Sequence, residues 1–157
     1  MKTATLKEIK NELNHRSPSE LLDLCLRLSR FKKENKELLT YLLFESSNEQ
    51  SYIDSVKREI EQEFKVINRK SYFYIRKSVR KILRNTKKYI RYSKNKETEV
   101  ELLLYFCYEL KEMSPSMKAN LTLQNIFNRQ ILLIRKVVSS MHEDLQYDYN
   151  LDIESLV

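Results

Sequence analysis

The sequence predicts an all-α protein, and three observations support that prediction. The 157-residue chain contains no glycine and only two prolines, so the tight turns and bulges of β-sheet proteins lack the residue that usually forms them. Apolar residues recur at intervals of three and four, as on one face of a helix. Short polar runs with serine, asparagine or proline interrupt this pattern. A chain of this length can bury a core as one unit, so we predict a single domain over residues 1–157.

The periodic segments predict six or seven helices. Ser17-Pro18 is a start signal, because serine can cap a helix and proline is tolerated in a first turn. The segment VELLLYFCYEL, at 100–110, is so densely apolar that we predict its helix to be the most buried of the domain. The approximate bounds of the segments are 6–14, 18–31, 34–44, 52–67, 69–96, 97–113 and 121–145.

Asparagine is predicted to end two of these helices, because it tolerates left-handed backbone in a chain without glycine. Asn68 follows the helix over 52–67, and Asn95 lies at the end of the segment over 69–96. The helix over 121–145 repeats its apolar residues in a heptad pattern, which predicts that it lies nearly antiparallel along a partner helix. The acidic tail, from about 144 to 157, is too weakly periodic to assign, and we expect it to be loosely docked.

Two segments of the chain are similar at an offset of 97 residues. The run EL-x3-SPS occurs at 12–19 and again at 109–116. This similarity slightly favours stacked antiparallel helical hairpins, arranged like an αα-superhelix, over a compact helical bundle. No regular period fills the interval between the two runs, so a repeat array is not established and both arrangements stay open.

Composition excludes several classes of site. The P-loop, the dinucleotide-binding fingerprint and the nucleophile elbow all require glycine. Cys25 and Cys107 lie in apolar runs without CxxC spacing, so we predict small core residues and neither a disulfide nor a metal site. The start of the chain lacks an apolar signal core, and no apolar run reaches the roughly 18 residues of a membrane span. We therefore expect a cytoplasmic protein without a cofactor.

Candidate catalytic residues are few. His15 and His142 are far apart in sequence and lack partners at metal-ligand spacing, so we interpret both as ordinary histidines. Glu97 and Glu101 lie one helical turn apart and could bind a cation or act as acid and base. Acidic residues near a helix start also interact favourably with the helix dipole, and that explanation is preferred here. We predict that the protein is not an enzyme.

The stretch from Arg69 to Lys96 contains twelve Lys or Arg and no acidic residue. Because the whole chain has 29 Lys and Arg, 17 basic residues remain elsewhere against 22 Asp and Glu. On a helix, the apolar residues of this stretch gather on one side and the cations on another. The arginines and lysines that we predict to bind a partner or nucleic acid are Arg76, Lys77, Arg80, Lys81, Arg84, Lys87, Lys88 and Arg91.

Four sources of negative charge are compatible with this cationic side. Glu97, Glu99, Glu101 or the acidic tail of the same chain would neutralise it internally. The outside sources are an acidic protein surface, a nucleic-acid backbone with nearby Tyr and Phe rings as stacking surfaces, and a membrane surface. The β-branched apolar side and the lack of Trp suit a folded core better than a membrane. We predict a non-enzymatic binding or scaffold module that docks an acidic partner, with nucleic-acid binding as the alternative.

The runs LTYLLFE at 39–45 and KKYIRYS at 87–93 are similar in composition and phrasing to those of short all-helical bacterial proteins of unknown function. The resemblance extends along most of the chain without a diagnostic motif. It implies a bacterial, cytoplasmic origin and assigns no site residue.

Overall fold

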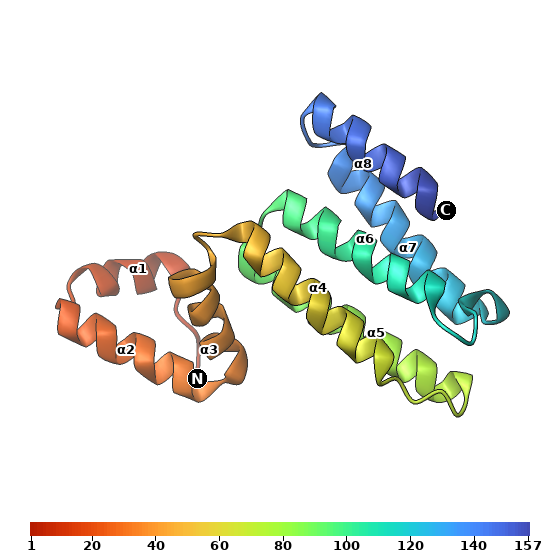
Figure 1. Ribbon diagram of the computed structural model, residues 1–157. Helices are drawn as coiled ribbons and strands as arrows, with labels where there is room; N and C mark the ends of the chain where they lie inside the picture. The colour runs from red at the N-terminus through yellow and green to blue at the C-terminus, as the bar shows by residue number, and fades with distance from the viewer. The chain divides into compact units, whose positions relative to one another are not determined.

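The computed structural model describes residues 1–157, and every regular element in it is helical (Figure 1). The all-α prediction is therefore confirmed. A π-helical turn, η1 (Tyr41–Glu45), continues α3, and a 3₁₀ turn, η2 (Met117–Ala119), precedes α7. The α-helices are α1 (Leu6–Asn14), α2 (Pro18–Phe31), α3 (Lys33–Thr40), α4 (Glu49–Lys65), α5 (Tyr72–Ser93), α6 (Lys96–Glu112), α7 (Leu121–Val138) and α8 (Glu143–Leu156). No helix combines the length and the apolar composition that crossing a membrane would need.

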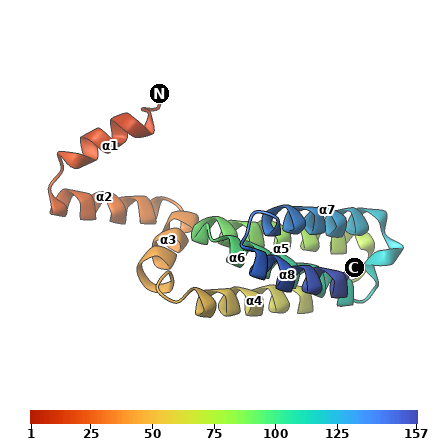
Figure 2. The same ribbon diagram turned by 90° about the horizontal axis from the view of Figure 1, so that it is seen from above.

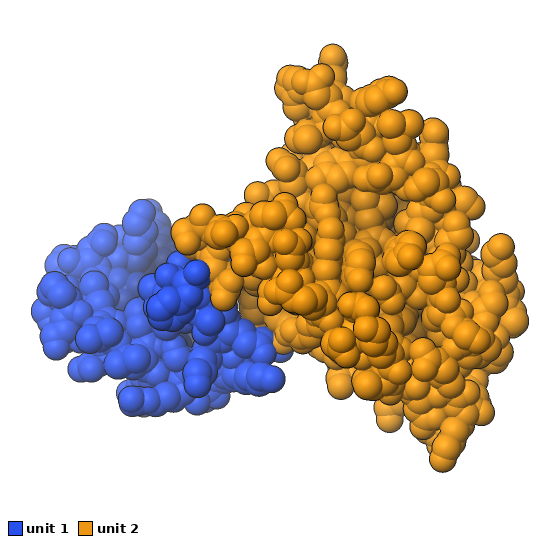
Figure 3. Space-filling view, viewed as in Figure 1, with its two compact units in different colours: residues 1–44 blue, residues 45–157 orange.

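The chain divides into two compact units, residues 1–44 and residues 45–157 (Figure 3). The single domain over 1–157 stays a prediction. The interiors of the two units differ greatly, because 26 of the 27 buried apolar side chains belong to residues 45–157. Helices α1, α2 and α3 bury no residue at all. The core of the protein therefore lies in the second unit.

Helix α6 is the central element of the second unit. It packs against α4, α5, α7 and α8 (Figures 1 and 2). Its fully buried apolar residues occur at neighbouring positions as well as at helical spacing, so they point to several sides of the helix. The prediction that this segment is the most buried is confirmed. These residues are Val100, Leu102, Leu103, Phe106, Cys107 and Leu110.

The acidic tail forms helix α8, which raises the number of α-helices to eight where the sequence predicts six or seven. One side of α8 is buried through Tyr149, Ile153 and Leu156, at steps of four and three. The ammonium group of Lys111 on α6 donates a hydrogen bond to the Leu156 carbonyl at 2.8 Å. Packing against α6 and α7 thus specifies a helix whose own apolar pattern is weak.

The predicted helix over 121–145 is wrong at its end, because α7 stops at Val138 and α8 begins at Glu143. The hydroxyls of Ser139 and Ser140 donate to the backbone carbonyls three residues earlier, at 2.8 and 2.7 Å. Such bonds compete with continuation of the helix. The ring of His142 then accepts a hydrogen bond from a backbone N–H of α8, which marks a new helix start.

Neither Asn68 nor Asn95 ends a helix in left-handed backbone, so both predictions are wrong. Lys94 is the one residue with positive φ, at 58°, and it ends α5. The side-chain oxygen of Asn68 accepts from the backbone N–H of Lys70 at 3.0 Å. That of Asn95 accepts from the N–H of Glu97 at 2.8 Å and so caps α6. A short side-chain acceptor suits capping and turns as well as left-handed backbone.

The two similar runs lead into different elements. The run at 12–19 leads into the α-helix α2, whereas the run at 109–116 leads into the short 3₁₀ turn η2. Ser17 begins α2 as predicted, with its hydroxyl accepting from the Glu20 N–H at 3.3 Å and its own N–H donating to the Glu20 carboxylate at 2.8 Å. This reciprocal pair is a capping box. Ser114 and Pro115 follow α6 and precede the short turn η2.

The two cysteines are unpaired and differ in environment. Cys107 is buried on α6, and burial raises the pKa of its thiol to about 12. Cys25 is exposed on α2. The predicted core position is thus right for Cys107 and wrong for Cys25, because the first unit lacks the interior that its apolar runs suggest.

We expect a thiol reagent such as DTNB to modify Cys25 rapidly in the folded protein and Cys107 only after unfolding. The thiolate is the reactive form, and a buried thiol with a raised pKa supplies almost none of it at neutral pH. The release of thionitrobenzoate with and without denaturant measures both reactions. Cys25→Ser is the matched variant, and rapid reaction of that folded variant would contradict the burial of Cys107.

Gln130 on α7 is 4% exposed, and its amide oxygen has no hydrogen-bond partner. Its amide nitrogen donates to the Ile126 carbonyl at 3.1 Å. A buried acceptor without a partner costs about 1–3 kcal/mol. We therefore expect Gln130→Met to raise the free energy of unfolding by about 1 kcal/mol, measured by urea titration. Gln124→Met, on the same helix but partly exposed, is the control. A lower free energy of unfolding for Gln130→Met would contradict the conclusion that the Gln130 amide oxygen is buried without a hydrogen-bond partner.

Candidate docking face on α5

Helix α5 is fixed to the second unit by its apolar side. Its buried residues recur at steps of three and four, and the helix packs against α4 and α6 (Figures 1 and 2). The hydroxyl of Thr86 among them donates to the Ile82 carbonyl within the helix at 3.0 Å, so its burial leaves no unpaired donor. The predicted helix over 69–96 is shorter in the structure, Tyr72–Ser93. The buried residues are Ile75, Val79, Ile82, Thr86 and Ile90.

Polar contacts along the edges of α5 hold it against its neighbours. The Tyr72 hydroxyl donates to the Ser116 carbonyl at 3.0 Å near the start of the helix. Toward α4, the Asn85 amide donates to Glu63 at 3.0 Å. The hydroxyl of Tyr89 donates to a second α4 carboxylate, Glu59, at 2.7 Å. The helix is therefore held on several sides and presents its remaining face in a defined orientation.

The cations that the sequence predicts for binding lie on that remaining face. Lys88 interacts within the chain, with its ammonium over the Tyr89 ring at 4.7 Å from the centroid. None of the other side chains in the set makes a hydrogen bond or an ion pair. The unpaired set is called the basic face below. It consists of Arg76, Lys77, Arg80, Lys81, Arg84, Lys87 and Arg91.

A shallow groove of about 580 Å³ runs along the amino-terminal half of the basic face. Phe73, whose side chain is 63% exposed, lies at one end of it. The Phe73 ring meets the Tyr74 ring edge to face, with 5.4 Å between the centroids. The aliphatic stems of the cations form much of the rest of the lining. The groove is lined by Phe73, Arg76, Lys77, Ser78, Arg80, Lys81 and Arg84.

The carboxylates that could neutralise this face from within the chain are directed elsewhere. Glu101 forms an ion pair with Lys57 of α4 at 2.5 Å. Glu97 and Glu99 make no ion pair. The tail helix α8 packs on α6 and α7. The basic face therefore keeps its charge uncompensated by direct contacts in this chain.

Two other cations of the stretch from 69 to 96 have structural roles. The Arg69 guanidinium donates to the carbonyl of Ser114 at 2.7 Å and to that of Phe64, near the end of α4, at 3.1 Å. The Lys96 ammonium donates to the Ser140 carbonyl at 3.1 Å. Basic groups beside the carboxyl ends of helices satisfy carbonyls that lack intrahelical partners. Arg69 and Lys96 are not among the residues that the sequence predicts to bind a partner.

Glu97 and Glu101, the candidate catalytic pair, have different environments. Glu97 is exposed, whereas Glu101 joins Lys57 and accepts a hydrogen bond from the Tyr149 hydroxyl at 3.5 Å. Burial, and after it the nearby Glu101 and Glu97 charges, raises the pKa of Tyr149 to about 12, so this phenol remains a donor at neutral pH. Lys57, Glu101 and Tyr149 thus connect α4, α6 and α8. Sequence reasoning missed Lys57 and Tyr149, because their partner lies 44 and 48 residues away.

No other cluster of catalytic or metal-ligating groups accompanies the basic face. His15 is exposed and bonds to the Asn11 carbonyl at 2.7 Å, and His142 caps α8. No group of three or more His, Cys, Asp or Glu side chains is arranged to hold a metal ion.

Comparisons with protein-family models, curated proteins and solved structures give no match.

We expect the midpoint of thermal unfolding to rise with added NaCl. Arg76, Arg80 and Arg84 are successive neighbours one turn apart, as are Lys77 and Lys81, and each like-charge pair destabilises a helix by about 0.2–0.5 kcal/mol. Salt screens this repulsion. Circular dichroism melts at increasing NaCl measure the effect, and Arg80→Gln with Arg84→Gln should reduce the dependence on salt. A midpoint that falls with salt would indicate that the face is paired.

Proposed function

We propose that this protein is a non-enzymatic binding or scaffold module, active in the cytoplasm, that docks an acidic partner on the basic face of α5. The observation that supports the proposal is that seven neighbouring cations make no hydrogen bond or ion pair within the chain. Their mutual repulsion opposes folding, and an external anion would relieve it.

An acidic protein surface is the partner that we favour. In this proposal Arg76, Arg80, Arg84, Lys87 and Arg91 engage its carboxylates, and the neighbouring lysines supply the flanking field. The guanidinium group binds a carboxylate through two parallel hydrogen bonds, which fixes geometry as well as charge. Arginine and aromatic residues are also enriched where proteins associate, and the groove on α5 combines both.

Nucleic acid is the second candidate, and the aromatic pair at the start of α5 is the observation that favours it. Phe73 and Tyr74 are both exposed, next to arginines that recur every turn. Single-stranded nucleic acid binds to sites that combine a positive groove along the backbone with rings on which bases stack. A duplex would use the cations alone.

The two candidates are separated by binding the full chain to polyglutamate, to a random duplex and to a random single strand at low and raised NaCl. Retention of polyglutamate alone supports an acidic protein partner. Retention of nucleic acid that weakens steeply with salt supports the second candidate, because each phosphate contact releases counterions. If none of the three probes is retained at low salt, the docking role is wrong.

Lysine acetylation of the complex locates the contact. Lys77, Lys81 and Lys87 should lose reactivity when the probe binds. Lys136 on α7 is exposed and supplies the matched control, since it lies outside the basic face.

A further inference from the structure

The first unit, residues 1–44, exposes far more apolar surface than the second. Of the 22 large apolar side chains that are exposed in the whole chain, 13 lie in these 44 residues. Its helices α1, α2 and α3 bury no residue, and Tyr41 of η1 is its one buried apolar side chain. A chain of this length rarely provides a sufficient core without a disulfide, a metal or another chain. Surface of this kind is typical of an interaction site.

Helices α1 and α2 are nevertheless well defined. Each begins with a complete capping box, formed by Thr5 with Glu8 and by Ser17 with Glu20. A capping box satisfies two otherwise unpaired N–H donors at a helix start. The hairpin α1–α2 is therefore specified by its own sequence, and no element of the first unit covers its apolar side.

The apolar side lies in an open groove between the two helices. Leu6, Ile9 and Leu13 recur at steps of three and four on α1 and are all exposed. Ile9 and Leu13, together with Leu24 of α2, line a groove of about 550 Å³. Figure 2 shows α1 and α2 diverging from the turn that connects them. An open pair of amphipathic helices is half of a four-helix arrangement.

The rim of this groove carries charges of both signs that are unpaired in the chain. Glu12, Asp23 and Arg27 line it, and none of the three makes an ion pair or side-chain hydrogen bond. The neighbouring Arg16 and Glu20 pair with each other at 3.4 Å. A symmetric interface brings the same patch against itself, so a two-fold axis that sets Arg27 of one copy opposite Glu12 or Asp23 of the other pairs these charges. The rim thus contains both members of such a pair.

We infer that a second copy of this chain covers the groove, so that two α1–α2 hairpins pack about a two-fold axis as a four-helix bundle. Ile9, Leu13 and Leu24 form its interior, and Arg27 pairs with Glu12 or Asp23 of the other copy at its edge. The residues of this interface belong to the first unit, whereas the basic face on α5 belongs to the second.

The test is the mass of the full chain in solution, measured by sedimentation equilibrium over a range of concentrations. The expected mass is twice the 19.0 kDa of one chain. Ile9→Asp with Leu13→Asp should raise the dimer dissociation constant by about 100-fold or more, because unpaired charges buried at an interface cost several kcal/mol. The helical circular dichroism of this variant should be kept, since neither side chain belongs to the core.

Leu132→Asp is the matched control, because Leu132 lies on α7 in the second unit and is 67% exposed. It should leave the dimer intact. Arg27→Glu should weaken the dimer by about tenfold, since reversal places like charges together, while Arg27→Lys should retain it. A wild-type chain that is monomeric at every concentration overturns the inference. A dimer unaffected by Ile9→Asp with Leu13→Asp does so as well.

Discussion

Reversing two charges on the basic face, Arg80→Glu with Arg84→Glu, is expected to weaken binding of the acidic partner by about 100-fold or more. Both residues line the groove on α5, and neither has a partner within the chain. Like charges brought together across an interface cost several kcal/mol, and each 1.4 kcal/mol is a factor of ten in affinity. Titration of the partner against wild-type and variant chains measures the loss.

The matched control carries the same change of net charge on another helix. Arg129 and Arg135 are exposed on α7 and make no ion pair. Arg129→Glu with Arg135→Glu should leave binding within about threefold, because surface charges away from the contact act mainly through the long-range field. If the α5 variant captured the same proteins as the wild type from a nuclease-treated extract, the docking role would be wrong.

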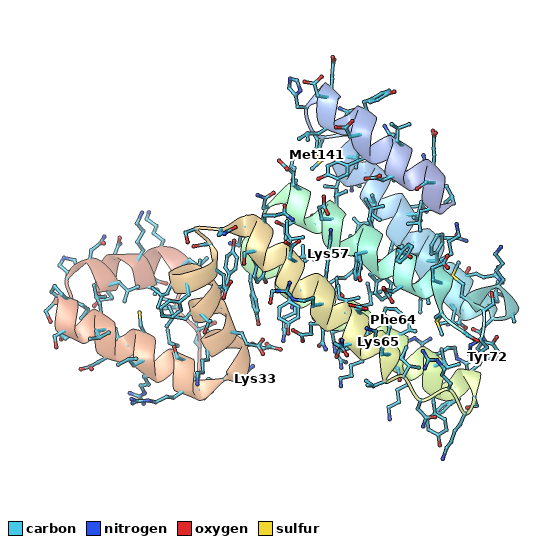
Figure 4. All side chains as sticks on the ribbon, viewed as in Figure 1. Lys33, Lys57, Phe64, Lys65, Tyr72 and Met141 are labelled. Carbon is cyan, nitrogen blue, oxygen red and sulfur yellow. The ribbon has the colours of Figure 1, made fainter.

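The variant Phe106→Ala is expected to lower the free energy of unfolding by about 3–5 kcal/mol. Phe106 lies fully buried in the middle of α6, and its ring is 5.7 Å from that of Phe64 on α4. Figure 4 shows Phe64 on the side of α4 that faces α6. Because α6 also packs against α5, α7 and α8, a cavity at this position is shared by the whole second unit.

Equilibrium unfolding in urea, followed by circular dichroism, measures this loss. Tyr108 is two residues further along α6 and 52% exposed. Tyr108→Ala should therefore cost about 1 kcal/mol or less. Equal losses for the two variants would show that α6 is not the centre of the core.

Local patterning was sufficient to predict the central and the basic helices. The apolar run at 100–110 and the two-sided pattern of 72–90 depend only on residues three and four apart, which is the information that a helix repeats. The same reasoning missed α8, because Tyr149, Ile153 and Leu156 are buried only by packing against α6 and α7, which are distant in sequence. It also misplaced Cys25, since an apolar helix is buried only where another element covers it.

The position of the basic face on α5 could be predicted from the sequence. Whether carboxylates of the same chain neutralise its charge could not. Whether Glu101 neutralises α5 depends on which helix lies nearest to it, and the structure pairs it with Lys57, 44 residues earlier in the chain. Ion pairs between distant residues leave no local pattern in a sequence. The spacing of Arg76, Arg80 and Arg84, by contrast, is a property of the helix alone.

The turn between α5 and α6 gives a direct way to search for the partner. Only Lys94 and Asn95 separate the helix that bears the basic face from the central helix of the core, and the left-handed backbone of Lys94 makes the reversal abrupt. A ligand held on α5 requires the folded second unit, so its binding energy adds to the stability of that unit. A ligand at 100 times its dissociation constant adds about 2.7 kcal/mol. Candidate ligands can therefore be ranked by the rise in melting temperature that each produces, without a label or an activity assay.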